Sequence, residues 1–253
     1  MEGSVAGSAR VGMGTILGNY VTIGENAVVG AGCVIGNNVV IHRDAVVGDN
    51  VRVDDNAVVG KMPMRAANSA VTKEQELPPA RIGSLCIIGT SAVIYRGCRI
   101  GEKVLVADLA TVRENVEVGD GTIIGRGVAV ENHCRIGSYC KLETNVYITA
   151  YSEIGDRCFI APCVATSNDN YLGRTEKRFK EYGGVVVKKG GRIGVNATIL
   201  PGKVVEEDTV VAAGAVLTKN TEAGKIYAGV PARYFREVPE EELLKNQDFK
   251  GRK

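Results

Sequence analysis

Aliphatic residues recur at every sixth position along most of the chain. The series is unbroken over residues 5–59, 82–160 and 187–217, with no polar residue at the repeated position. The position four residues later is small or β-branched, as at Cys33, Ala57 and Cys134. Two residues separate that small position from the next aliphatic one, which is the alternation of a β-strand, so both side chains face inward. The pattern therefore predicts one short strand in every hexad.

The hexads together predict an all-β fold, a parallel β-helix. Three hexads close one triangular coil, and successive coils stack at the strand spacing of about 4.8 Å. At three hexads to a coil, the repeats predict about nine or ten coils. A glycine often follows the aliphatic residue, as Gly194 does. We expect these glycines to supply the unusual φ that a corner needs.

The register breaks at about residues 61–80 and 166–186, where two longer segments are inserted. A β-helix accommodates loops at its corners, and long loops in a compact domain are often functional. We therefore assign residues 1–237 to the β-helix with its two insertions. Residues 238–253 follow as a cap, in which Pro239 and the acidic residues after it predict a short helix over the open end of the prism.

The composition fits a narrow, regularly filled core, since aromatic residues make up 5% of the chain and Trp is absent. The net charge of +2 gives no reason to expect nucleic acid or an anionic membrane as a partner. The N-terminus lacks the features of a signal peptide, and no apolar run is long enough to span a membrane. Six of the seven Cys occupy the small inward position without any CxxC pair, which predicts reduced thiols in a cytoplasmic protein.

The C-terminal hexads resemble a known family. Residues 193–202, 211–219 and 228–233 resemble the last coils of the hexapeptide-repeat acyltransferase superfamily, and the resemblance extends over nearly the whole chain. It implies a left-handed β-helix, a homotrimer, and acetyl-CoA bound in a groove between two subunits, with no metal. Small residues would let the pantetheine arm lie flat, and basic residues would meet the coenzyme phosphates. The cofactor-binding residues expected on this basis are Gly194, Ala212, Ala213, Lys219 and Arg233.

A narrower resemblance concerns the two insertions. The run from Asn168 to Tyr171 (NDNY) and the segments KMPM and LPP of the first insertion are similar to those of the dTDP-3-amino-3,6-dideoxyhexose N-acetyltransferases. This resemblance implies transfer of an acetyl group to the amino group of a dTDP- or UDP-linked amino sugar, at C3. The alternative is an O-acetyltransferase that acts on a sugar or another small hydroxylated acceptor.

The candidate catalytic residues are His133 and Glu143. Because one coil holds 18 residues, His133, Tyr151 and Asp169 are expected to form one ridge, with Glu143 and Asn145 on the neighbouring edge. A His and carboxylates beside a polar loop suit amine binding and proton transfer, although any outward residue can equally be an ordinary solvated one. The expected substrate-binding residues are Asn145, Tyr151, Asn168, Asp169, Tyr171, Arg174 and Lys188.

Simpler explanations exist for several of these residues. Asn168 and Asp169 can serve only as turn residues, and the basic side chains of the second insertion can be solvated charges. His42 lies in an early coil and is expected at the surface, away from the site.

Other classes of protein fit the sequence less well. A γ-type carbonic anhydrase needs three His around zinc, and the chain has only His42 and His133, about five coils apart. A nucleotidyltransferase would need a nucleotide-binding domain, and the hexads already begin at Val5. A passive rod or an ice-binding surface is disfavoured by the mixed, charged outward positions and by the irregular second insertion. Transfer to an amino acid remains open beside the O-acetyl alternative.

Overall fold

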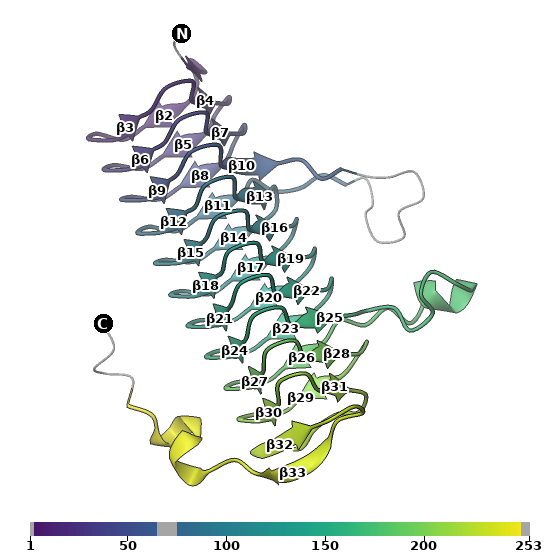
Figure 1. The fold of residues 1–253 in the computed structure, drawn as a ribbon. Helices are drawn as coiled ribbons and strands as arrows, with labels where there is room; N and C mark the ends of the chain where they lie inside the picture. The colour runs from purple at the N-terminus through teal and green to yellow at the C-terminus, as the bar shows by residue number, and fades with distance from the viewer. Residues whose placement is uncertain (1–2, 65–74, 249–253) are drawn as a thin grey trace.

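The computed structural model describes residues 3–64 and 75–248, and these residues form a parallel β-solenoid with three flat faces (Figure 1). The predicted β-helix is confirmed. Sheet A consists of β1 (Ser4–Val5), β4 (Thr22–Ile23), β7 (Val40–Ile41), β10 (Val58–Lys61), β13 (Val93–Tyr95), β16 (Thr111–Val112), β19 (Ala129–Val130), β22 (Tyr147–Ile148), β25 (Ala165–Thr166), β28 (Thr198–Ile199) and β31 (Val216–Leu217).

Sheet B follows sheet A in each turn of the chain. It consists of β2 (Arg10–Val11), β5 (Val28–Val29), β8 (Val46–Val47), β11 (Arg81–Ile82), β14 (Arg99–Ile100), β17 (Glu117–Val118), β20 (Arg135–Ile136), β23 (Glu153–Ile154), β26 (Val186–Val187) and β29 (Val204–Val205).

Sheet C completes each turn. It consists of β3 (Ile16–Leu17), β6 (Val34–Ile35), β9 (Arg52–Val53), β12 (Ile87–Ile88), β15 (Leu105–Val106), β18 (Ile123–Ile124), β21 (Lys141–Leu142), β24 (Phe159–Ile160), β27 (Arg192–Ile193), β30 (Val210–Val211), β32 (Lys225–Ala228) and β33 (Arg233–Glu237). Within the described part of the chain the three sheets have 11, 10 and 12 strands, so the shortest matches the upper end of the predicted number of coils.

The strands pair in the register that the hexads predict. Ile136, for example, pairs with Ile154, one coil of 18 residues later. The second residue of nearly every strand is the inward one, and Ile88, Ile94 and Ile124 are fully buried. Six of the Cys are buried as predicted, whereas Cys163 is exposed at a corner. The core is therefore a stack of similar small layers, which explains why so few aromatic residues are needed.

The corner glycines were predicted to supply a positive φ, and for Gly194 this explanation is wrong. Gly194 does not have a positive φ; that conformation belongs to the residue two positions later, Asn196, with φ of 57°. A Cβ on Gly194 would instead lie 2.5 Å from the backbone nitrogen of Ala213 in the next coil. Glycine is needed there because successive coils pack too closely for any side chain.

Both insertions leave the solenoid at the same corner, between sheets A and B. The first lies between β10 and β11, which agrees with the predicted limits; residues 65–74 fall outside the described part of the chain. The second starts one residue later than expected, because Thr166 keeps the register of β25 and is buried. It contains the 3-10 helix η1 (Glu176–Phe179), and Figure 1 shows the described parts of both segments projecting on the same side of the prism.

The predicted C-terminal helix is wrong. Residues after Val238 form two short 3-10 helices, η2 (Glu240–Glu242) and η3 (Leu244–Asn246), separated by the extended residue Leu243. The hairpin β32–β33 covers the open end, while η2 and η3 lie along the last coils, where Arg192 pairs with Glu242 at 2.6 Å. Leu243 has extended backbone angles, with φ of −66° and ψ of 144°, so the first turn ends there and no longer helix forms. No helix in the described residues is long and apolar enough to cross a membrane.

A buried arginine anchors the first insertion to the solenoid. Arg96 is 8% exposed, and its guanidinium donates hydrogen bonds to the carbonyl oxygens of Leu77 (2.9 Å) and Arg43 (3.0 Å) and to the Asp44 carboxylate (3.0 Å). His42, expected at the surface, is half-buried beside this insertion. Burial, Lys61 and Arg96 together lower the pKa of His42, so this imidazole is neutral at physiological pH.

Candidate functional site

Two cavities lie on either side of the corner between sheets A and B, at the base of the second insertion. The one on the side of sheet A, here called the loop cavity, has a volume of about 370 Å³. The one on the side of sheet B, here called the stack cavity, has a volume of about 390 Å³. The loop cavity is lined by Glu131, Tyr147, Thr149 and Ala150 of the solenoid and by Asn168, Asp169, Leu172, Gly173, Arg178 and Tyr182 of the insertion.

Asp169 holds the second insertion in shape. Its carboxylate accepts the backbone N–H groups of Tyr171 (2.8 Å) and Gly173 (3.0 Å) and pairs with the Arg178 guanidinium at 3.0 Å. Although desolvation opposes it, these hydrogen bonds and the Arg178 charge lower the pKa of Asp169. The carboxylate is thus ionised and committed to the loop. It is better suited to shaping the cavity than to accepting a proton.

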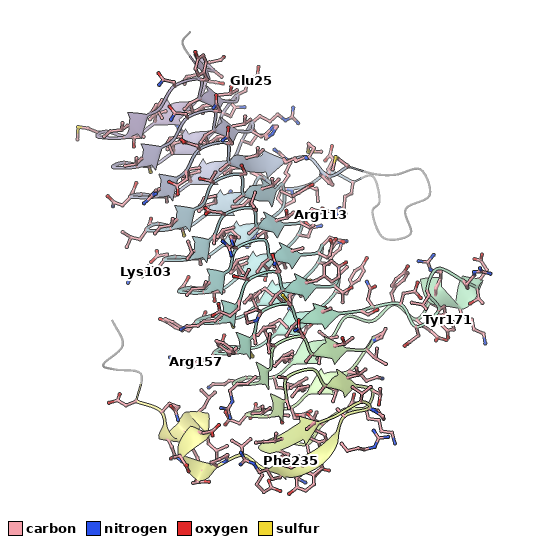
Figure 2. All side chains as sticks on the ribbon, in the orientation of Figure 1. Glu25, Lys103, Arg113, Arg157, Tyr171 and Phe235 are labelled. Carbon is pink, nitrogen blue, oxygen red and sulfur yellow. The ribbon has the colours of Figure 1, made fainter. Side chains whose placement is uncertain are left out.

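Other residues of the insertion divide into those near the cavity and those at its tip. Arg178 donates to the Tyr182 hydroxyl at 2.5 Å, and both line the cavity. The Tyr171 hydroxyl donates to Glu181 on the exposed side of the loop. Arg174 is exposed and does not line the cavity. Figure 2 shows Tyr171 well out along the projecting segment.

Glu131 is the carboxylate that the solenoid contributes to the loop cavity. Its Oε2 lies 3.4 Å from Nη1 of Arg113, one coil below. The Arg113 guanidinium also donates two hydrogen bonds to the Glu114 carboxylate, at 2.9 Å and 3.1 Å, and lies over the Tyr95 ring. Burial raises the pKa of Glu131, Arg113 opposes this, and the charge of Glu114 adds to the increase. Two carboxylates therefore share one guanidinium, and the one that lines the cavity, Glu131, has a raised pKa.

His133 and Tyr151 form a wall of the stack cavity. Their rings are parallel, with centroids 5.1 Å apart. The predicted ridge is thus present for these two residues, but the third member, Asp169, lines the loop cavity instead. The second insertion passes directly over this wall, since a Cβ on Gly184 would lie 2.1 Å from the Tyr151 carbonyl oxygen.

The sequence matches the family described as bacterial transferase hexapeptide (six repeats) over residues 8–43 and 97–132. It also matches the hexapeptide repeat of succinyl-transferase over residues 79–107 and 184–219. Over these stretches the chain is similar to the repeats of hexapeptide transferases.

Curated relatives of this hexapeptide-repeat chain match it over short stretches. One stretch is 42% identical over 62 residues to gamma carbonic anhydrase 1, mitochondrial, of Arabidopsis thaliana, and covers 24% of this chain and 22% of that protein. Another is 36% identical over 63 residues to the 2,3,4,5-tetrahydropyridine-2,6-dicarboxylate N-acetyltransferase of Staphylococcus aureus, and covers 25% and 26%. The chain thus spans about a quarter of the length of these relatives.

Similar solved structures include acyltransferases. A mutant of perosamine N-acetyltransferase from Caulobacter crescentus, in complex with CoA and GDP-perosamine, is 25% identical, with 53% of this chain and 57% of that chain covered and a TM-score of 0.45. A UDP-N-acetylglucosamine acyltransferase from Francisella novicida is 19% identical, with 95% and 70% covered and a TM-score of 0.43.

The remaining predicted site residues of the hexapeptide repeats lie at other corners. Glu143 and Asn145 follow β21, and Gly194, Ala212 and Ala213 follow β27 and β30, so all five are at the corner between sheets C and A. The full width of sheet A separates them from His133 within one chain. A shared site with His133 therefore requires a second copy of the chain, which stays a prediction.

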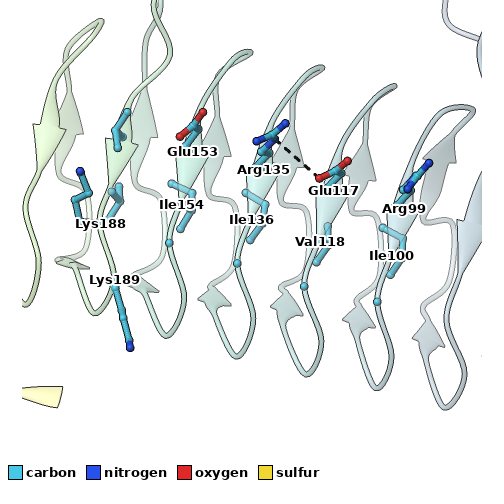
Figure 3. Close-up of a pocket in the computed structure, with 16 residues that line it drawn as sticks. Arg99, Ile100, Glu117, Val118, Arg135, Ile136, Glu153, Ile154, Lys188 and Lys189 are labelled. Carbon is cyan, nitrogen blue, oxygen red and sulfur yellow. Dashed lines mark ion pairs between the residues drawn. The ribbon is translucent and has the colours of Figure 1, made fainter. Parts of the chain in front are cut away.

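Lys188 belongs to neither cavity at the base of the insertion. It lines a groove on sheet B together with Lys189 and with a ladder of outward charges, in which Arg135 and Glu117 lie 3.9 Å apart (Figure 3). Lys219 follows β31 at the last corner between sheets A and B, and Arg233 begins β33 in the terminal hairpin. In the described part of the chain no three His, Cys, Asp or Glu side chains are grouped to hold a metal ion.

The sequence analysis missed the three-residue network of Arg113, Glu114 and Glu131. A signal for it exists in the hexads. The position after the inward aliphatic residue is usually Gly or another small residue, but at this corner Arg113 and Glu131 occupy it in successive coils. Oppositely charged residues at the same corner of successive coils are expected to pair, because the coils lie about 4.8 Å apart.

Proposed function

We propose that the protein transfers an acetyl group from acetyl-CoA to the amino group of a nucleotide-linked sugar, with dTDP or UDP as the nucleotide and C3 as the position. One observation carries the proposal: Glu131, a half-buried carboxylate of raised pKa, lines a cavity that the second insertion helps to form. A group with this proton affinity can take the proton of an ammonium ion and leave the nucleophilic amine.

The reaction needs few steps. Glu131 accepts a proton from the substrate ammonium, and the free amine attacks the thioester carbonyl of acetyl-CoA. The C–N bond forms and the C–S bond breaks, the leaving thiolate takes up the second proton of the attacking nitrogen to give the free thiol, and Glu131 releases its proton to solvent. The site's main contribution is to hold the amine and the thioester in contact, because a free amine already reacts with a thioester.

In this proposal the acceptor occupies the loop cavity at the foot of the insertion and extends over the corner to the stack cavity. Asn168 and Tyr147 offer hydrogen bonds to the sugar, and Arg178 offers a positive charge toward the diphosphate. The parallel rings of His133 and Tyr151 give a flat wall beside it. Asp169 acts on the substrate indirectly, since its carboxylate is already bonded within the loop.

Acetyl-CoA would lie at the corner between sheets C and A of a second copy in a homotrimer. There Gly194, Ala212 and Ala213 leave the backbone accessible. Lys219 lies in the last coil, and Arg233 lies in the terminal hairpin. Glu143 and Asn145 would face the acceptor from the same second copy. A mass in solution three times that of one chain supports this arrangement, and a monomer that turns over acetyl-CoA contradicts it.

The proposal is tested by thiol release from acetyl-CoA with a panel of dTDP-, UDP- and GDP-linked amino sugars and their hydroxyl analogues. We expect release only with amino acceptors, and in the parent but not in Glu131→Gln. Release with hydroxyl acceptors alone would instead assign O-acetyl transfer. Matched amounts of the Glu102→Gln variant, altered at an exposed acid on another corner, serve as the control.

A further inference from the structure

The side chain of Asn132 is buried without a partner from the protein. The residue is 1% exposed, and neither its Nδ2 nor its Oδ1 forms a hydrogen bond with any described group. Buried amide groups in native proteins are almost always satisfied, by protein or by ordered water. The surroundings of Asn132 should therefore contain a hydrogen-bond partner for its side-chain amide.

Asn132 lies in the wall between the two cavities. The preceding residue, Glu131, lines the loop cavity, and the following residue, His133, lines the stack cavity. The Asn132 carbonyl accepts the backbone N–H of Tyr151 at 3.1 Å, which fixes the wall to the next coil. The side chain is therefore aimed into the solenoid, between the two groups that the proposed reaction uses.

A second buried polar residue at this corner is Glu114. It occupies the same corner position one coil below, is 1% exposed, and accepts the His133 backbone N–H at 3.1 Å through its carbonyl. Stacked coils are about 4.8 Å apart, a spacing at which one water can bridge an amide and a carboxylate. In the next coil the position is Ala150, whose methyl group offers the amide of Asn132 no hydrogen bond.

A water bound to Glu114 would affect Glu131, because the two carboxylates share one cation. Arg113 is shared between Glu114 and Glu131, with two contacts to the first and one longer contact to the second. From the insertion, Asp169 and Arg178 line the same cavity but pair with each other, and Tyr147 and Tyr182 add only phenol groups. On the far side of the wall is His133. The balance between Glu114 and Glu131 is thus set by whatever stabilises the Glu114 carboxylate.

We propose that Asn132 is a positioning residue: it holds a buried water against the Glu114 carboxylate, keeps that carboxylate ionised on Arg113, and so leaves Glu131 as the group that takes up the substrate proton. The inference deepens the proposed function and rests on it for the role of Glu131. The charge balance itself does not depend on any activity.

The test is the titration of Glu side chains, labelled with ¹³C at the carboxyl, in the parent and in Asn132→Leu. Signals are assigned with Glu131→Gln and Glu114→Gln. Without the amide, Glu114 loses its water and binds its proton more tightly, and Arg113 turns toward Glu131. We expect the Glu131 midpoint to fall by about one pH unit and the Glu114 midpoint to rise. Unchanged midpoints for both carboxyls in folded Asn132→Leu would overturn the proposal.

Two further variants make the result decisive. Asn19→Leu changes an exposed Asn at the equivalent hexad position of another corner, and both midpoints should stay as in the parent. If Asn132→Leu does not fold, Asn132→Val gives the same comparison with a smaller side chain. A shifted Glu131 midpoint with no turnover of any amino sugar would uphold the role of Asn132 and refute the proposed function.

Discussion

The His133 and Tyr151 rings lie face to face, with centroids 5.1 Å apart and ring planes only 3° from parallel. The two residues are one coil apart, and both have a left-handed backbone, with φ of 59° and 64°. The separation of the rings is close to the spacing of the coils themselves. Because residues 18 apart in sequence stack in successive coils, His133 and Tyr151 form a rigid aromatic wall at the foot of the second insertion.

We expect Tyr151→Ala to weaken acceptor binding, because the wall loses one of its two rings. An aromatic contact contributes about 1 kcal/mol, so KM for the nucleotide-linked sugar should rise about fivefold. Steady-state kinetics with saturating acetyl-CoA measure this. Tyr139→Ala is the matched control, since Tyr139 is an exposed corner residue with a similar φ of 57° on another edge. Equal KM values in the two variants would remove the wall from the site.

Glu131→Gln is expected to lower kcat by about 10²- to 10⁴-fold, the usual contribution of a general base. Folding should be unaffected or improved, because burial already disfavours the ionised carboxylate. Thermal unfolding and thiol release measured on the same preparation separate the two effects. A variant that retains full turnover would show that the substrate loses its proton elsewhere.

The pH dependence should follow the raised pKa of Glu131. Acetyl transfer needs the ionised form, so kcat/KM should fall as the pH drops through a value above 4.5, the ordinary value for this group. For stability the sign is opposite. The folded state holds the proton more tightly than the unfolded state, so the parent loses stability relative to Glu131→Gln as the pH rises from 4.5 through the folded pKa. Urea unfolding at several pH values tests this.

Arg96→Met should destabilise the protein by about 3 kcal/mol, since it removes a buried guanidinium that donates to the carbonyl oxygens of Leu77 and Arg43. Arg99→Met removes an arginine from the exposed face of sheet B and should change stability by no more than about 0.5 kcal/mol. Chemical unfolding compares them. Similar values for both would mean that Arg96 does not anchor the first insertion.

Gly194→Ala separates packing from cofactor binding. Its Cβ would lie 2.5 Å from the Ala213 nitrogen, so we expect a loss of about 1–3 kcal/mol of stability. Gly7→Ala, which places its Cβ where nothing lies within 4 Å, should be neutral. If Gly194→Ala is as stable as the parent and only binds acetyl-CoA less tightly, the close stacking of coils is not what requires this glycine.

The regular part of the fold was predictable, because every inward position repeats the same physical demand. The register of Ile136 and Ile154 follows from counting by 18. The structural role of the corner glycines was not predictable, because a sequence does not show whether Gly194 is needed for its φ or for its missing Cβ. The C-terminal segment also failed, because Pro239 and the acids after it fit the first turn of a helix that never continues.

The candidate site was predictable only in part. Counting coils brought His133 and Tyr151 together correctly. It could not place Asp169, because the chain leaves the register after Thr166 and the loop then folds around the Asp169 carboxylate. Glu143 shows the other limit: neighbouring hexads lie at different corners, so residues close in sequence are separated by the width of a face.

The most direct test of the account is the fate of a ¹³C-labelled acetyl group supplied as acetyl-CoA together with a nucleotide-linked amino sugar. NMR of the purified product distinguishes an amide from an ester carbonyl. The account predicts an acetamido sugar formed by the parent protein and lost in Glu131→Gln. An acetyl group found on a hydroxyl oxygen, or an acetamido sugar formed equally well without the Glu131 carboxylate, would contradict it.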